Sequence, residues 1–340
     1  MTVKKRASDE SIGVSRAEAG TEIREVDDAR CWDDFASSAV GATPFSTSPF
    51  LQCAAAGWQT PHRAFGAFRH GRLVAGVTGL ESNRHGFRRL STPELFPHTG
   101  FLFRPAQSAR PAAQESEWSQ ALRTLLPFLK DRYAQIRLSC APAINDLREA
   151  SWDGWSLTPR YTYQVELPGD RQKLWESFER RTRTTVRKAE REGYRVEAGC
   201  GIGEIVRLYQ LVYNGTAPPV APSILERCLD SIQSQVEIWR IDSTTGETAS
   251  AVVFVRWQST LYAWLAGANP AFRDTGATTL LYWKILESTS ATCFDFVGAN
   301  MQAIALFKRG FGGRVVNYLS LEGFGSPVLR RLSLLRRALQ

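Results

Sequence analysis

The chain has 340 residues, of which 43% are hydrophobic and 22% are charged, and its formal net charge is +8. This length suits two domains of ordinary size, with two cores or one continuous sheet, and the composition excludes a disordered or fibrous protein. The positive charge implies acidic partners, and the classes that fit are phosphorylated metabolites, nucleic acid and a lipid surface.

Residues 1–20 are polar and lack hydrophobic periodicity, so we expect a flexible N-terminal arm. The arm begins with basic residues but has no apolar signal-peptide core, and no run in the chain approaches the roughly twenty apolar residues of a membrane span. We therefore predict a cytoplasmic protein. The six Cys are spread singly and the four His lack ligand spacing, which argues against a metal site and a disulfide framework.

The first half, residues 21–160, is predicted to be one domain in which short strands and helices alternate. A helix should begin at Asp27 or Asp28, and a second should begin through Ser48 and its neighbouring proline. Apolar runs on both sides of His70-Gly71 indicate an antiparallel hairpin. The other expected elements are a strand at 21–26, a Pro-, Gly- and aromatic-rich loop from about 83 to 114, an amphipathic helix at 117–133 and a strand at 134–140.

The second half, residues 161–325, repeats this order of elements. Three strands, a loop, a helix and a strand between about 236 and 298 correspond to the hairpin, loop, helix and strand between about 63 and 139. Residue identity between the copies is slight, so the repeat is one of pattern. A hairpin pairs its strands antiparallel, and a helical crossover joins parallel strands, so this order indicates a mixed sheet. The predicted fold class is therefore α/β, with two similar mixed-sheet domains in tandem.

The loop before the last long helix has the features of an anion site. Arg273 is followed by Gly276, and a helix with apolar residues at helical spacing comes directly after. Glycine at such a turn lets backbone amides approach a ligand, and the partial positive charge of the helix N-terminus adds to that of Arg273. The alternative is an ordinary helix entry with a turn glycine. The residues assigned to this loop are Arg273, Thr275, Gly276, Ala277 and Thr278.

A basic helix follows the expected strand at the junction of the two halves. Four of its arginines recur at spacings of three and four residues, which places them on one helical face. We interpret this face as a contact for phosphate or another polyanion, and assign Arg183 and Arg187 to substrate binding. A solvated surface helix is the alternative. The cations of the helix are Arg180, Arg181, Arg183, Arg187, Lys188 and Arg191.

Asp295 lies between Phe294 and Phe296 in an expected strand, so its side chain points to the opposite face of the sheet and should be at least half buried. A buried carboxylate must be paired, or its pKa rises. Lys308, on the helix that follows, is an available partner or a separate stabiliser of phosphate or an oxyanion. A structural tie is the alternative to a catalytic role for both residues. Asn300 is expected to cap the same helix, with substrate binding as the alternative.

Two further features, an aromatic pair and the C-terminal tail, each have two interpretations. Tyr262 and Trp264 share one face of the strand before the loop at Arg273. Either one of them lines an acyl pocket or both pack in the core. Residues 326–340 form a basic C-terminal tail with four Arg, no acid and several Leu. A short basic amphipathic helix of this kind fits either peripheral contact with the inner face of an anionic membrane or a simple cap on the fold.

Three stretches of this sequence resemble the FemAB-like branch of the GNAT superfamily of N-acyltransferases, which includes peptidoglycan aminoacyltransferases. The most specific feature is an aromatic-Asp-aromatic-x-Gly strand end followed about ten residues later by Phe-Lys-x-x-Phe-Gly. The resemblance extends over about residues 21–325. The matching stretches are residues 181–196, 271–287 and 294–313.

The resemblance implies two GNAT-like halves and a cleft in which an amine attacks an activated acyl carbon. It also implies that the loop at Arg273 is the pyrophosphate loop, R/Q-x-x-G-x-G/A, in which Thr278 replaces the usual Gly or Ala. The second half lacks the long helical hairpin of the tRNA-dependent members. The resemblance further implies acyl-CoA as a co-substrate. This chemistry requires no side-chain nucleophile and no metal, so we expect no tightly bound cofactor.

We therefore predict an N-acyltransferase that moves an acyl group from acyl-CoA to an amine of a sugar, polysaccharide or cell-envelope precursor. Asp295 and Lys308 are the catalytic candidates. One alternative is an aminoacyl-tRNA-dependent peptidyltransferase of cell-wall synthesis, whose arginine-rich helix would contact the RNA. Another is a degenerate, non-catalytic acyltransferase fold that acts at a membrane surface or as an assembly partner. The substrate-binding candidates are Arg183, Arg187, Tyr262, Trp264 and Asn300.

Overall fold

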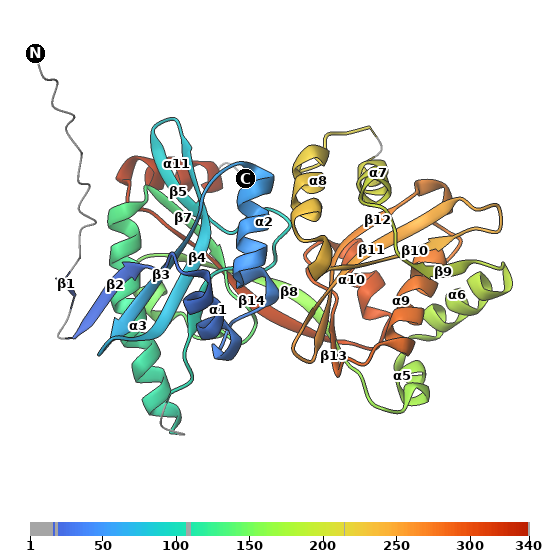
Figure 1. Ribbon diagram of the computed structural model, residues 1–340, viewed down its shortest axis with the longest axis horizontal. Helices are drawn as coiled ribbons and strands as arrows, with labels where there is room; N and C mark the ends of the chain where they lie inside the picture. The colour runs from blue at the N-terminus through green and yellow to red at the C-terminus, as the bar shows by residue number, and fades with distance from the viewer. Residues whose placement is uncertain (1–15, 18–19, 107–109, 214, 339–340) are drawn as a thin grey trace, which may run out of the picture.

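The computed structural model describes residues 16–17, 20–106, 110–213 and 215–338. These residues form two lobes that share one mixed sheet of 14 strands, with helices packed around each lobe (Figure 1). The predicted α/β class with a mixed sheet is thus confirmed. In spatial order the strands of the main path are β1-β2-β3-β4-β5-β7-β14-β8-β13-β12-β11-β10-β9, and β6 pairs with β4.

The first lobe contains the N-terminal strands and the helices that cover them. Its helix α1 begins where expected, because the Asp28 side chain accepts hydrogen bonds from the amides of Arg30 and Cys31. The elements are β1 (Arg16–Ala17), β2 (Thr21–Glu25), α1 (Ala29–Ser38), η1 (Pro44–Ser46), α2 (Ser48–Trp58), β3 (His62–Arg69), β4 (Arg72–Arg84), β5 (Phe87–Ser91), β6 (Phe101–Phe103), α3 (Pro111–Arg132), β7 (Gln135–Ser139) and α4 (Arg148–Trp152).

The second lobe repeats this arrangement with more helices, and two long strands join the lobes. Those strands are β8 (Ser156–Glu166) and β14 (Arg314–Gly323). The other elements of the second lobe are α5 (Arg171–Ser177), α6 (Arg180–Arg191), β9 (Arg195–Ala198), α7 (Ile202–Val212), α8 (Pro222–Ser231), η2 (Gln233–Gln235), β10 (Glu237–Asp242), β11 (Thr248–Trp257), β12 (Thr260–Ala268), η3 (Pro270–Phe272), α9 (Ala277–Ser288), β13 (Cys293–Asp295) and α10 (Gln302–Arg309). The last helix, α11 (Pro327–Ala338), follows β14 and lies at the first lobe (Figure 1).

The pattern repeat seen in the sequence corresponds to a repeat in space. In each lobe a long helix leads into the second of two neighbouring parallel strands: the segment between β5 and β7 contains β6 and then α3, and the segment between β12 and β13 contains α9. The strand β14 pairs with β7 of the first lobe and with β8, which in turn pairs with β13 of the second. The boundary expected after residue 160 falls inside β8, so the backbone crosses between the lobes within the shared sheet.

One part of the first half differs from expectation. The segment predicted as a loop from about 83 to 114 contains β5 and β6, and β4 extends into it as far as Arg84. A tight turn at His85-Gly86, both with positive φ, joins β4 to β5. The two arginines in β5 conceal its alternation, because only Leu90 of that strand is fully buried.

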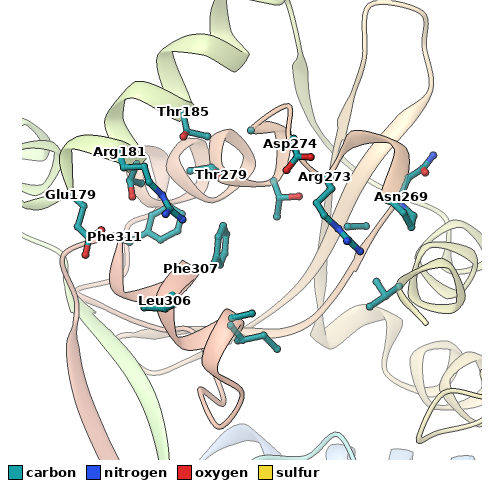
Figure 2. Close-up of a pocket in the computed structure, with 18 residues that line it drawn as sticks. Glu179, Arg181, Thr185, Asn269, Arg273, Asp274, Thr279, Leu306, Phe307 and Phe311 are labelled. Carbon is teal, nitrogen blue, oxygen red and sulfur yellow. The ribbon is translucent and has the colours of Figure 1, made fainter. Parts of the chain in front are cut away.

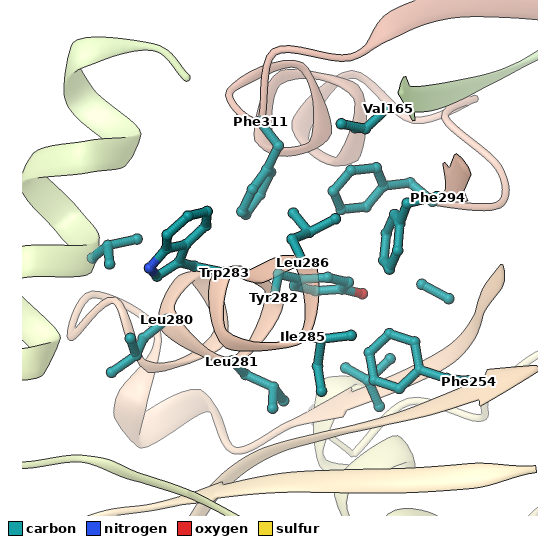
Figure 3. Close-up of a cluster of buried hydrophobic side chains, with 14 of the residues drawn as sticks. Val165, Phe254, Leu280, Leu281, Tyr282, Trp283, Ile285, Leu286, Phe294 and Phe311 are labelled. Atoms are coloured by element: carbon teal, nitrogen blue, oxygen red, sulfur yellow. The ribbon is translucent and has the colours of Figure 1, made fainter. Parts of the chain in front are cut away.

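Four hydrophobic clusters of the described residues form the core, and the smallest of them lies around Trp32 and Phe35 in the first lobe. Figure 3 shows the cluster of the second lobe, in which Tyr282 and Leu286 of α9 pack toward Phe294 of β13. A second cluster lies under α3 in the first lobe. The third joins the lobes, because Phe45 and other first-half residues pack against second-half residues. Burial of each such aromatic side chain contributes about 1.5–3 kcal/mol to folding.

The ends of the chain are described only in part. The expected flexible arm lies outside the described residues, except that Arg16–Ala17 pair with β2 as strand β1 and Gly20 is in a turn. At the other end, α11 occupies most of the expected basic tail and stands beside the first lobe (Figure 1). Within the described part of the chain, every helix is too short or too polar to cross a membrane.

Candidate functional site

A cavity of about 580 Å³ lies at the carboxyl end of β12, between α6, the loop that leads into α9, and α10 (Figure 2). The parallel strands β12 and β13 pair only from Thr260 to Tyr262, after which β12 continues to Ala268 while β13 ends at Asp295. The cavity opens where this pairing has ended. The sequence folds this way because Gly276 and the turn before it reverse the chain at that edge of the sheet.

Gly276 determines how closely the loop approaches α6. Its φ is +87°, a conformation that side-chain-bearing residues rarely adopt. A Cβ atom at this position would lie 2.6 Å from Cγ2 of Thr185 and 2.9 Å from the Thr185 carbonyl oxygen, both on α6. The residue is the N-cap of α9. Glycine therefore lets the start of α9 pack directly against α6.

The N-terminus of α9 faces the cavity. Gly276, Thr278 and Thr279 all line it, and the first amides of an α-helix have no acceptor within the helix. The Thr275 hydroxyl donates to the Phe272 carbonyl at 2.8 Å and accepts from the Ala277 amide at 3.2 Å, which holds the turn before the helix. The replacement at Thr278 therefore adds a half-buried hydroxyl to the cavity wall beside these amides.

Two arginines point into the cavity from different elements. Arg273 comes from the loop before α9, and Arg181 comes from the first turn of α6 (Figure 2). Neither guanidinium makes a hydrogen bond or an ion pair with the residues that the structure describes. Glu179 and Asp274 also line the cavity, and the Glu179 carboxylate is paired with Arg309 at 2.8 Å. Two uncommitted guanidinium groups beside a helix N-terminus suit an anion of more than one charge.

The opposite wall of the cavity is apolar. Phe307 and Leu306 of α10 form it together with Phe311, which follows the helix (Figure 2). The cavity thus combines a cationic end with an apolar side, which suits a ligand that carries both phosphate and aliphatic groups. Arg181 and the apolar face of α10 were not assigned to this site from the sequence. The apolar spacing in α10 was the available signal, whereas Arg181 could be placed only once α6 was packed against the loop.

Asp295 is buried and lies beside the cavity rather than in its wall. Its side chain is 1% exposed and accepts hydrogen bonds from the Thr162 hydroxyl at 2.6 Å, the Gln164 side-chain amide at 3.0 Å and the Val297 backbone amide at 2.8 Å. Burial raises the pKa of Asp295, and these three donors act in the opposite direction. The carboxylate therefore joins β13 to β8 and to the turn that follows β13.

Lys308 holds the same turn from α10. Its ammonium donates to the backbone carbonyls of Phe296 at 2.7 Å, Val297 at 2.6 Å and Gly298. Burial lowers the pKa of Lys308 to about 8, whereas the Asp295 carboxylate acts to raise it. The two residues make no direct ion pair. Val297 has a φ of +51°, which is strained for a β-branched residue, and Lys308 and Asp295 both bond to it.

The substrate-binding candidates lie in several places. Asn300 accepts from the Tyr161 amide at 3.0 Å, and Met301 rather than Asn300 is the N-cap of α10, which corrects that expectation. The Arg183 guanidinium donates to the carbonyls of Glu176 and Phe178, whereas Arg187 lies 5.5 Å from the Trp175 ring centre on the outer side of α6.

Tyr262 and Trp264 lie between the lobes and not in the cavity wall. Both are buried, and both contact Phe45 of the first half at ring-centre distances of 5.9 and 5.8 Å. The Trp264 indole donates to the Leu95 carbonyl at 2.9 Å. This geometry favours the core-packing alternative, because the two side chains face away from the cluster that surrounds α9.

Comparisons with known proteins show what the second half and the overall fold are similar to. Residues 176–309 match the family model described as acetyltransferase (GNAT) domain. This span contains the cavity loop, Asp295 and Lys308. No curated protein sequence matches the chain.

Several solved structures share the fold of the whole chain. FemX has a TM-score of 0.65 at 14% identity, with 88% of this chain and 96% of FemX covered. A tandem GNAT protein from the clavulanic acid biosynthesis pathway has a TM-score of 0.54 at 12% identity, with coverage of 90% and 99%. L-PGS from Bacillus licheniformis has a TM-score of 0.52 at 12% identity, with coverage of 90% and 93%. These matches show that the chain shares the fold of FemX and of the tandem GNAT protein, as the sequence predicted.

Proposed function

We propose that this protein, which carries a GNAT acetyltransferase domain at residues 176–309 within a FemX-like fold, transfers an acyl group from acyl-CoA to an amine. The observation that carries the proposal is the cavity, in which the N-terminus of α9 faces the guanidinium groups of Arg181 and Arg273 across a space with an apolar side. The pyrophosphate of the donor would bind the first amides of α9 and the two arginines, and its aliphatic arm would lie along α10.

The acceptor that we propose is an amine of a sugar, polysaccharide or cell-envelope precursor, as the FemAB-like fold suggests. In this reaction the neutral amine attacks the thioester carbonyl, the C–N bond forms, the C–S bond breaks, and the amine proton is lost as the thiol leaves. Lys308 and Asp295 would act by holding the turn at the end of β13, so that the reacting carbonyl meets fixed backbone donors. No cofactor besides the co-substrate is needed for these steps.

Replacing Arg273 with alanine should weaken acyl-CoA binding by about tenfold or more, because one charge-assisted hydrogen bond is worth about 1.5–3 kcal/mol. Arg273 is exposed and makes no side-chain hydrogen bond within the described chain, so the melting temperature should not change. Isothermal titration of acetyl-CoA into both proteins measures the effect. Arg195→Ala is the matched control, since that exposed arginine lies on β9 outside the cavity.

Titration of acetyl-CoA also distinguishes acyl-CoA from the second candidate donor, an aminoacyl-tRNA. The outer face of α6 carries Arg180, Arg187 and Arg191, which form no ion pairs with the described residues, and this favours an aminoacyl-tRNA as the alternative donor. In that case acetyl-CoA would not bind the wild type. RNA would bind instead, with an affinity that falls steeply with salt and depends on these three arginines. Binding of neither ligand would favour the degenerate, non-catalytic fold.

We also propose peripheral membrane contact through α11. Val328, Leu332 and Leu335 recur at spacings of four and three residues and are each more than half exposed, at 59%, 51% and 62%. Residues 326–340 contain four Arg and no acid, so this apolar stripe is combined with positive charge. The helix would bring the protein to a lipid-linked acceptor at the inner face of an anionic membrane.

Flotation with liposomes that contain anionic phosphatidylglycerol tests this contact. The wild type should float with these liposomes and not with neutral ones, and Leu332→Glu should reduce the floating fraction several-fold, because it places an acid on the apolar stripe. Glu226→Gln on α8 serves as a control for surface charge outside α11. Flotation that is equal for wild type and Leu332→Glu would show that α11 is only a cap on the first lobe.

A further inference from the structure

A second cavity, of about 310 Å³, lies in the first lobe and belongs to none of the steps above. Its lining residues come from the β3–β4 hairpin, the N-terminal half of α3 and neighbouring segments of the first lobe, and none comes from the second lobe. Figure 1 shows that β3, β4 and α3 lie together in the first lobe. Three arginines and one histidine line it, against a single acid, Glu117. The basic residues are Arg69, His70, Arg72 and Arg104.

The positive charges in this cavity are not neutralised by the described protein. Arg104 uses its Nε to donate to the Leu73 carbonyl at 2.9 Å, and Arg69 donates to the side-chain oxygen of Gln120. Arg72 is exposed and makes no side-chain hydrogen bond or ion pair within the described chain, and Glu117 pairs with none of the three arginines. Burial and the neighbouring Arg72 guanidinium lower the pKa of Arg104. Like charges held together without a counter-ion create a preference for an anion.

The other wall of the cavity is apolar and aromatic. Trp118 stacks on Phe103 with a ring-centre distance of 4.9 Å and an interplanar angle of 18°. Its indole Nε1 is buried and has no hydrogen-bond partner in the described chain. Ala121 and Val74 complete the wall. A ligand with an apolar part would cover this surface.

We propose that this cavity binds a small organic phosphate, with the phosphoryl group between Arg72 and Arg104 and the organic part against Trp118. The planar fork of arginine matches phosphate oxygens in pairs, which favours phosphate over a single carboxylate. The volume is at the lower end of the range for ligand pockets, so the ligand is smaller than the donor bound in the second lobe. This site is additional to the proposed acyl transfer.

Isothermal titration of phenyl phosphate and of inorganic phosphate into the full chain, at one ionic strength, tests the proposal. Phenyl phosphate should bind at least tenfold more tightly than inorganic phosphate, because only the former has a part that contacts Trp118. Arg72→Ala should weaken phenyl phosphate binding tenfold or more, and it should fold normally because the exposed Arg72 side chain makes no hydrogen bond or ion pair with the described residues. Arg84→Ala, at the other end of β4, is the matched control and should bind as the wild type does.

The double variant Arg181→Ala/Arg273→Ala distinguishes this cavity from the one in the second lobe. It should retain phenyl phosphate binding while losing acetyl-CoA binding. The proposal is overturned if phenyl phosphate does not bind the wild type, if Arg72→Ala binds as tightly as the wild type, or if the double variant loses binding. Equal affinity for phenyl phosphate and inorganic phosphate would overturn the proposed contact of the organic group with Trp118. The cavity would then be a site for free phosphate.

Discussion

Gly276→Ala should weaken acyl-CoA binding by about thirtyfold or more and lower the free energy of unfolding by about 2–5 kcal/mol. Two costs combine in this estimate. A residue with a Cβ pays about 1–2 kcal/mol in the left-handed region that Gly276 occupies, and overpacking adds about 1–3 kcal/mol. The new Cβ would lie 2.9 Å from the Thr185 carbonyl oxygen, which is backbone and cannot rotate away.

The loss of binding follows because the loop must move away from α6 to relieve this contact. Arg181 on α6 and Arg273 on the loop would then no longer face the same phosphates. Urea denaturation and titration of acetyl-CoA measure the two effects. Gly246→Ala is a close control, since Gly246 also has a positive φ, +81°, but a Cβ there meets nothing within 4 Å. It should lose about 1 kcal/mol of stability and bind acetyl-CoA normally. Unchanged donor binding in Gly276→Ala would contradict the assignment of this loop.

Lys308→Met should lower the free energy of unfolding by about 3–5 kcal/mol, and turnover should fall with it. Methionine has a similar length but no donor, so the carbonyls of Phe296, Val297 and Gly298 lose the ammonium that bonds all three. An unsatisfied buried polar group costs about 1–3 kcal/mol, and removal of one partner of a buried charged group costs about 3–5 kcal/mol. The strained turn at Val297 should then relax. Urea denaturation and an acyl-transfer assay together measure this result.

Two companion variants make the Lys308 experiment decisive. Arg309→Met removes the next cation on α10, which is exposed and forms an ion pair with Glu179, and should cost about 1 kcal/mol or less. Asp295→Asn keeps the shape but places an amide among three donors, and should also destabilise the protein. If Lys308→Met and Asp295→Asn both lost turnover while their unfolding free energies stayed at the wild-type value, the two residues would be catalytic groups and not positioning residues.

The sequence was most informative where the relevant residues are close together in the chain. Arg273 and Gly276 lie in one turn, and the cap of α1 at Asp28 depends on amides two and three residues away. The order of strands and helices in the two halves was also readable, because the hydrophobic periods of hairpins and helices are local. The fold class and the relation to FemX-like structures could therefore be predicted.

The remaining features depend on contacts between distant segments. Thr162 and Gln164 satisfy Asp295 only because β8 lies beside β13 in the shared sheet, which no local pattern indicates. Arg181 reaches the cavity because α6 packs on Gly276. The strand β5 was missed because its arginines hide the alternation of a half-buried strand. The N-cap position of α10 is Met301, which makes no side-chain capping bond, and the Asn300 side chain instead accepts from the Tyr161 amide of β8.

A crystal structure of the protein with a non-hydrolysable acyl-CoA analogue tests the central claim most directly. We expect the pyrophosphate to lie within hydrogen-bond distance of the amides of Thr278 and Thr279, with Arg181 and Arg273 on either side and the aliphatic arm along Phe307. Density for the analogue elsewhere on the molecule, or an empty cavity at an analogue concentration that saturates binding in solution, would contradict it.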